Sequence, residues 1–201
     1  VEAIKIVART HQTLIWDRQR HLGRLEADLR GYFPAALAAF DTATTDLQDP
    51  DVLELLRVAP TPQAAARLPL SRISAAGRRA RRRDPHGRAL VIQAALRAPA
   101  LGQPEVLTGA YAVSVSALVG VITALNDQIA TLQGQVEAHF GRHPAAEIYR
   151  SQPGLGAILG ARELGEFGDD PHRYRNGKAR KNYAGTSPIT RASGKRRTVC
   201  A

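Results

Sequence analysis

The side chains best suited to chemistry in this sequence lie near its C-terminal end. Between residues 172 and 197 there are nine cations and no carboxylate. A solvated protein face normally mixes the two signs, so this stretch favours contact with a phosphate backbone. The cations are Arg173, Arg175, Lys178, Arg180, Lys181, Arg191, Lys195, Arg196 and Arg197.

A serine stands among these cations, in the sequence ASGKRR. The hydroxyl of Ser193 could attack phosphorus if a base or a metal ion assisted its deprotonation. A Ser-Gly pair is also a common hairpin turn, so residue type alone leaves both interpretations open. Ser187 is a competing serine, which we interpret as structural. Cys200 is a possible nucleophile by its chemistry alone, but no base lies beside it in the sequence.

The residues present do not predict a metal site. A single cysteine excludes an internal disulfide framework, and the six histidines show no repeated ligand spacing. The carboxylates of residues 1–30 fall on an expected helix, and the others are scattered rather than gathered on strands. A metal ion that activates Ser193 would therefore need ligands from elsewhere.

The segment before the cations, AAEIYRSQPGLGAILGARELGEFG, predicts a short helix, a tight turn and a second helix that ends near Gly168. This pattern is similar to a helix-hairpin-helix module. Gly154 and Gly156 in the turn would let backbone N–H groups approach a phosphate at a helix N-terminus without reading base sequence. Glycine-rich turns also occur for packing alone, and that alternative stays open.

Residues 1–103 are expected to be helical. Apolar residues three or four apart predict a helix over 2–30, which Pro34 ends or kinks. Asp49 and the proline after it form an expected N-cap and first helical position. The shorter helices are expected over 34–40, 50–58 and 88–97.

An arginine run, GRRARRRDPHGR, falls between two of these helices. Six arginines there face a lone acidic residue, Asp84. The run is either a solvated basic face or a contact surface for nucleic acid, and the sequence does not separate the two.

Residues 104–141 predict one long helix with a coiled-coil seam. Apolar residues step by alternating fours and threes over nearly four heptads, so the seam needs a partner helix. The partner is either the 2–30 helix running antiparallel or the same helix of a second protomer. We favour the second protomer and therefore expect a homo-oligomer. The seam positions are Tyr111, Val115, Leu118, Ile122, Leu125, Ile129, Leu132 and Val136.

The composition narrows the class of partner. Lys and Arg number 28 against 18 Asp and Glu, for a net charge of +10, which favours a polyanion such as DNA or RNA. We find no apolar run close to the roughly 20 residues that cross a bilayer, and we expect no membrane partner and a cytoplasmic location. The expected fold class is mainly α, with a short β-turn or strand segment at the C-terminal end.

Four motifs together carry a family resemblance. They are PGLG at 153–156, EFGDDPHRY at 166–174, YAGTSP at 183–188 and SGK at 193–195. With the upstream AIKIVARTHQTLIWDRQRHL and YFPAALAAF, they resemble bacterial insertion-sequence transposases of the IS110 family. The likeness runs over most of the chain and is most specific over 151–197.

The resemblance implies recombination of DNA by a composite site. An N-terminal RuvC-like domain with acidic residues would hold Mg²⁺, and its ligands would lie outside this chain. By motif, Ser193 would be the nucleophile, a guide RNA would bridge two DNAs, and the protein would work at the bacterial nucleoid. The chain would then comprise a helical region (1–103), a coiled-coil helix (104–141) and an incomplete C-terminal domain (144–201).

Two functions remain open from the sequence. The chain is either a partial transposase whose catalysis depends on missing parts or a non-catalytic module that binds nucleic acid and oligomerises. A structural coiled-coil protein with an incidental basic tail would instead be insensitive to salt.

Overall fold

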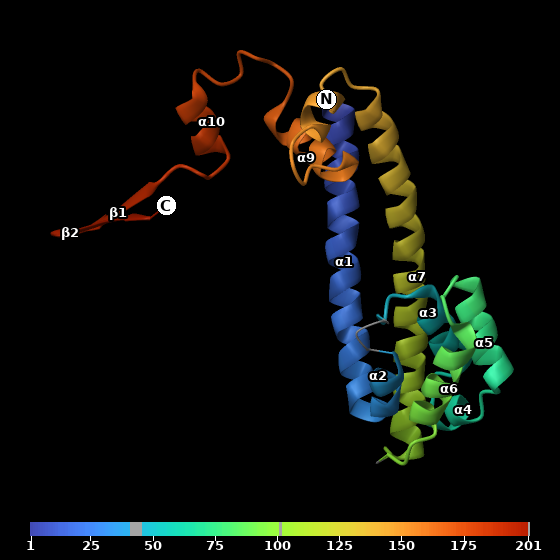
Figure 1. Cartoon of the computed structure of the whole chain (residues 1–201). Helices are drawn as coiled ribbons and strands as arrows, with labels where there is room; N and C mark the ends of the chain where they lie inside the picture. The colour runs from blue at the N-terminus through green and yellow to red at the C-terminus, as the bar shows by residue number, and fades with distance from the viewer. Residues whose placement is uncertain (41–45, 101, 201) are drawn as a thin grey trace. The chain divides into compact units, whose positions relative to one another are not determined.

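The computed structural model describes residues 1–40, 46–100 and 102–200, and it confirms a mainly α fold. The chain forms two compact units (Figure 1). The larger unit comprises residues 7–136, and the smaller comprises residues 1–6 together with 137–201. The side chain of Cys200, which the sequence raised as a second nucleophile, lies outside the described part.

The larger unit is built on an antiparallel pair of long helices, α1 (Glu2–Tyr32) and α7 (Glu105–Gly141), which lie side by side in Figure 1. Asp28 accepts a hydrogen bond from the hydroxyl of Ser114 at 2.7 Å, and Arg18 donates one to the Asn126 side chain at 2.9 Å. These paired positions run in opposite directions along the two helices. The seam of α7 is thus covered within the chain, whereas we had favoured a second protomer.

The burial pattern of α7 agrees with the predicted seam. Four of its positions are at most 7% exposed, and Tyr111 stacks on Tyr32 with ring centroids 5.1 Å apart. Leu118, Leu125 and Leu132 are half-buried at its edges. The four buried positions are Val115, Ile122, Ile129 and Val136.

Short helices pack against one end of this pair, and prolines set where most of them begin. A proline has no N–H to lose in the first turn, so it favours a helix start. Thr61 and Asp84 cap two of them by accepting hydrogen bonds from the backbone N–H of Ala64 and Gly87. The helices are α2 (Pro34–Phe40), α3 (Pro50–Val58), α4 (Pro62–Ala66), α5 (Leu70–Arg79) and α6 (Pro85–Leu96).

Helix α7 is more apolar than we expected from the sequence. One 18-residue window has a mean hydropathy of 1.9, so by length and composition α7 could cross a membrane. Our expectation that no apolar run approaches that length was wrong. A single helix of this kind is weak support for a membrane span, because core helices of other proteins share the property.

The smaller unit contains three short helices and a two-stranded antiparallel hairpin. Its core gathers around Phe140 and Leu164, both fully buried. Gly160 and Gly165 allow close packing, since a Cβ on the first would lie 2.7 Å from the Phe140 ring and one on the second 3.0 Å from the Lys5 backbone. The elements are α8 (Ala146–Arg150), α9 (Ala157–Phe167), α10 (Gly177–Tyr183), β1 (Ile189–Ser193) and β2 (Arg196–Cys200).

Candidate nucleic-acid interface

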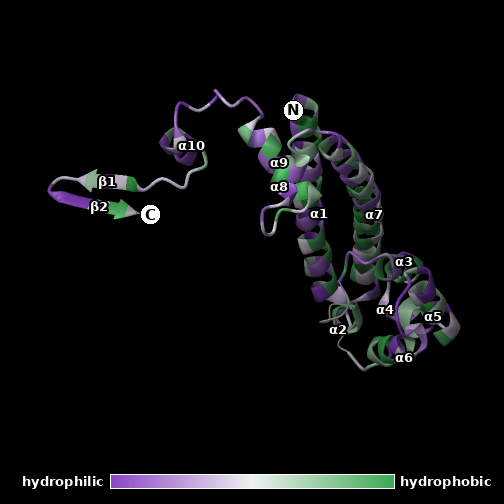
Figure 2. Ribbon diagram, turned by 45° about the horizontal axis from the view of Figure 1, so that its top comes forward, coloured by the Kyte–Doolittle hydropathy of each residue, from purple (hydrophilic) through white to green (hydrophobic). Residues whose placement is uncertain are grey.

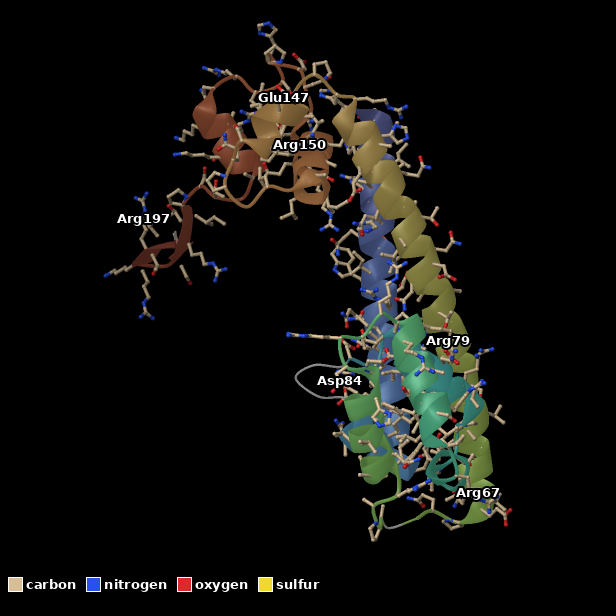
Figure 3. The ribbon with its side chains drawn as sticks, turned by 45° about the vertical axis from the view of Figure 1, so that its right-hand side comes forward. Arg67, Arg79, Asp84, Glu147, Arg150 and Arg197 are labelled. Atoms are coloured by element: carbon tan, nitrogen blue, oxygen red, sulfur yellow. The ribbon has the colours of Figure 1, made fainter. Side chains whose placement is uncertain are left out.

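Ser193 lies at the tip of the β1–β2 hairpin and is exposed. It ends β1 and pairs with Arg196 across a two-residue connection. Gly194 in that connection has φ +58°, the glycine-first pattern of a type II′ turn, whose twist suits a hairpin. Arg197 projects from β2, where it pairs with Ala192 (Figure 3). The hydroxyl is therefore accessible and has cations as its immediate neighbours.

The sequence of the hairpin and of the segment that leads to it contains no Asp or Glu. The last acidic residue of the sequence is Asp170. Across residues 1–40, 46–100 and 102–200, no group of three or more His, Cys, Asp or Glu could hold a metal ion. The described residues therefore do not fit the Mg²⁺ that the family resemblance implies.

Two of the nine cations lie over aromatic rings, although both are exposed. Arg173 lies over the rings of Tyr174 and Tyr183, 5.4 and 5.2 Å from their centroids. Arg180 lies 5.4 Å from the Phe167 ring centroid and 5.5 Å from that of Tyr174. The three rings contact one another, and this aromatic cluster (Phe167, Tyr174, Tyr183) holds α10 against the end of α9.

Tyr183 also explains part of the YAGTSP motif. Its hydroxyl donates to the Glu166 carbonyl at 3.1 Å, which ties the ring to the end of α9 although Tyr183 is 49% exposed. After it, Gly185 takes φ +70° and donates to the Asn182 carbonyl, while Thr186 donates to the Lys181 carbonyl. This is the Schellman arrangement, in which a glycine ends a helix.

The other seven cations of the stretch are exposed too, and Figure 2 shows α10 and the start of β2 in the hydrophilic colour. Two of them, Lys178 and Lys181, line a hollow of about 650 Å³ between α10 and the loop before β1. Sequence reasoning found the two lysines but missed the hollow, although their i, i+3 spacing on a helix was a usable signal. The remaining exposed cations are Arg175, Arg191, Lys195, Arg196 and Arg197.

The turn between α8 and α9 is open to solvent at both glycines. Gly154 has φ +81°, a conformation that favours glycine. Gly156 has an ordinary φ of −73°, and a Cβ there would meet nothing within 4 Å. Packing therefore does not require a glycine at Gly156. Close approach of a ligand to the backbone would require one.

Two arginines of the run in the larger unit are paired with carboxylates. Arg82 donates to Asp51 at 3.0 and 2.6 Å and also to Asp49. Hydrogen bonding to Asp51 raises the pKa of Arg82 above its ordinary value, although partial burial opposes the shift. Arg79, labelled on α5 in Figure 3, donates to Glu54. These two arginines support the fold, whereas other arginines of the run are exposed.

Asp49 has a different role from the predicted cap. It occupies the N-cap position of α3, as its sequence context suggested, but its side chain makes no capping hydrogen bond. The carboxylate instead accepts from Arg82 and from the Asp46 backbone N–H. The Asp49 carboxylate therefore bonds to Arg82 and to the Asp46 amide, and not to the amides in the first turn of α3.

Comparisons with known proteins find similarity to transposases of insertion elements. Residues 146–200 match the family described as "Transposase IS116/IS110/IS902 family". The chain is 37% identical over 199 residues to the "Mini-circle putative transposase for IS117" of Streptomyces coelicolor, covering 98% of this chain and 48% of that protein. No solved structure matches it.

Two further relatives are each 31% identical to the chain. They are the IS900 uncharacterized 42 kDa protein of Mycobacterium paratuberculosis, over 194 residues, and the IS116 uncharacterized 44.8 kDa protein of Streptomyces clavuligerus, over 199. The alignments cover 96% and 98% of this chain, and 47% of each relative. The chain thus spans about half the length of the curated relatives it matches.

Proposed function

Because the chain belongs to the IS116/IS110/IS902 family of transposases, we propose that it supplies the nucleophile and a DNA-binding surface for DNA transposition. The observation that carries this proposal is the position of Ser193, exposed at a hairpin tip and paired with Arg196 in a stretch without carboxylates. A serine that served only a turn would also be exposed at a hairpin tip, so it is the cations around Ser193 that support the nucleophile.

The proposed reaction is a transesterification. The Oγ of Ser193 forms a bond to phosphorus, the bond from phosphorus to a deoxyribose oxygen breaks, and the proton of the hydroxyl ends on the leaving oxygen. Lys195, Arg196 and Arg197 would neutralise the charge that develops on the phosphoryl oxygens. DNA remains joined to the serine until a second transfer releases it.

Several parts of this proposal rest on the family resemblance alone. They are the participation of Mg²⁺, the guide RNA, and work on nucleoid DNA in the bacterial cytoplasm. Self-association through α7 is also a proposal. It now concerns a different face of the helix from the predicted seam, because Val106 and Val113 are 84% and 73% exposed while the seam packs on α1.

A second candidate is a DNA-binding module that does not catalyse. The absence of a metal-holding group among the described residues favours it for this chain on its own. We therefore propose that the isolated chain retains DNA and that catalysis appears only beside acidic residues of a longer protein.

The decisive experiment is a chimaera. This chain replaces the 199 residues it matches in the Streptomyces coelicolor relative, and the chimaera is incubated with an end-labelled DNA duplex that bears the element junction and with Mg²⁺. We expect label that stays on the protein in denaturing gels, and none with Ser193→Ala. Thr198→Val is the matched control, because Thr198 is another hairpin hydroxyl, opposite Arg191.

Each result has a defined meaning. Label that persists in the Ser193→Ala chimaera would refute the nucleophile, and loss of label with Thr198→Val would show that any change to the hairpin abolishes activity. Label on the isolated chain that Ser193→Ala removes would refute the second candidate.

A further inference from the structure

A hollow beside α10 is not accounted for by the hairpin chemistry. Its volume is about 650 Å³, within the range of small-ligand sites. Lysine, asparagine and serine side chains contribute to its wall, and no carboxylate does. The lining residues are Gly177, Lys178, Lys181, Asn182, Ser187 and Pro188.

The two groups of basic residues on α10 have different surroundings. Arg180 stacks on Phe167 and Tyr174 and so fixes the helix. Lys178 and Lys181 line the hollow, where both are exposed and neither has a carboxylate nearby in the sequence. Stacking needs the planar guanidinium of arginine, whereas a lysine ammonium is a mobile point charge suited to an anion.

The wall of the hollow is held by backbone hydrogen bonds. Thr186 donates to the Lys181 carbonyl at 3.1 Å and Gly185 to the Asn182 carbonyl at 3.2 Å. These bonds fix the path of the chain from the end of α10 towards Ser187, which is half-buried. The lysines therefore face a preformed surface, and binding would cost little ordering of the backbone.

We propose that this hollow is a binding site for one DNA phosphodiester, separate from Ser193. Lys178 and Lys181 share a single phosphate, and the Asn182 amide and the Ser187 hydroxyl donate to its remaining oxygens. The contact reads the backbone and carries no base information, so it positions DNA on the smaller unit. The inference rests on the proposed function for its partner but does not need Ser193 to react.

A shared phosphate makes a quantitative prediction. Each phosphate neutralised contributes about 0.9 to the slope of log affinity against log salt concentration on duplex DNA. If two lysines hold one phosphate, removing both should lower the slope by about one rather than two. The matching loss of affinity is about tenfold at 100 mM NaCl, if the affinities converge near 1 M.

The test is fluorescence anisotropy with a labelled DNA duplex from 50 to 200 mM NaCl, using the full chain. The variants are Lys178→Gln, Lys181→Gln, the double variant and Ser187→Ala. Arg24→Gln is the charge-matched control, because Arg24 is exposed on α1 in the other unit. Lys181→Arg should bind nearly as wild type. Circular dichroism melts confirm that each variant is folded.

We expect the double variant to lower the slope by about one and each single variant to lower it by less, because the remaining lysine still neutralises the shared phosphate. Ser187→Ala should weaken binding two- to threefold, and Arg24→Gln should change nothing. A slope reduced by about two in the double variant would overturn the shared phosphate. Unchanged DNA binding in the double variant would overturn the site. An RNA duplex of the same sequence forms a second arm, and a loss confined to RNA would also refute the proposal.

The outcome separates this inference from the proposed function. If the double variant binds like wild type while the chimaera labels through Ser193, the hollow is wrong and the function stands. If the slope falls as predicted while no label depends on Ser193, the phosphate site stands and the nucleophile is wrong.

Discussion

Two arginine-rich stretches of this chain have opposite surroundings. In the run at 78–83, Arg82 is held by Asp49 and Asp51, and Arg79 by Glu54. In the stretch at 173–197, all nine cations are exposed, two of them lie over aromatic rings, and the sequence of the stretch holds no carboxylate. A run of arginines therefore does not itself mark a nucleic-acid surface. The carboxylates that tertiary structure brings to it decide whether its charge is available.

The net charge is also distributed unevenly between the two parts of the chain. Nine of the 28 Lys and Arg residues but none of the 18 carboxylates lie in residues 171–201. The first 170 residues therefore carry 19 cations against 18 carboxylates and are almost neutral. Since attraction to a polyanion follows the unneutralised charge, DNA should be drawn to the C-terminal stretch.

The largest expected effect comes from breaking the buried pairing in the first stretch. Asp51 is only 4% exposed and accepts two hydrogen bonds from Arg82. Asp51→Ala leaves the guanidinium partly buried with Asp49 as its remaining partner, which should lower the free energy of unfolding by about 3 kcal/mol. Urea denaturation followed by circular dichroism measures it.

Asp127→Ala is the control for that measurement, because Asp127 is exposed on α7. It should change the stability by less than about 0.5 kcal/mol. Equal stability of the Asp51→Ala variant and the wild type would mean that the paired arginines do not support the fold, and the comparison between the stretches would fail.

A smaller effect is expected in the second stretch, where stacking replaces ion pairing. Arg173→Lys keeps the charge but loses the planar group that lies over Tyr174 and Tyr183. We expect α10 to be destabilised by about 1 kcal/mol, seen as faster hydrogen exchange of its amides. Salt dependence of DNA binding should be unchanged. If exchange in α10 is unaltered, Arg173 acts through its charge alone.

Much of the fold could be predicted from local patterns. The four-and-three spacing of apolar residues indicated the long α7, and Pro34 and Pro50 stand at helix starts because their missing N–H costs nothing there. The hairpin also follows locally from Gly194, which can take the positive φ that the turn requires.

Partners that are distant in the sequence could not be predicted in the same way. Arg82 and Asp51 are 31 positions apart and meet only because α3 and α5 pack together. The α7 seam would fit either α1 or another protomer, and the pattern alone contains no information on which is closer. The hollow beside α10 depends on the path of the loop after Gly185, which residue types do not specify.

The smallest effect on stability is expected from the exposed ion pair between Arg79 and Glu54. Arg79 is 55% exposed, and its bond to Glu54 should contribute at most about 1 kcal/mol to stability. Arg79→Ala should leave the salt slope of DNA binding unchanged, because Glu54 already neutralises that charge. Arg191→Ala removes an equal charge from β1, where carboxylates are absent from the surrounding sequence, and should lower the slope by about one. Equal slopes for the two variants would show that pairing does not decide which arginines reach DNA.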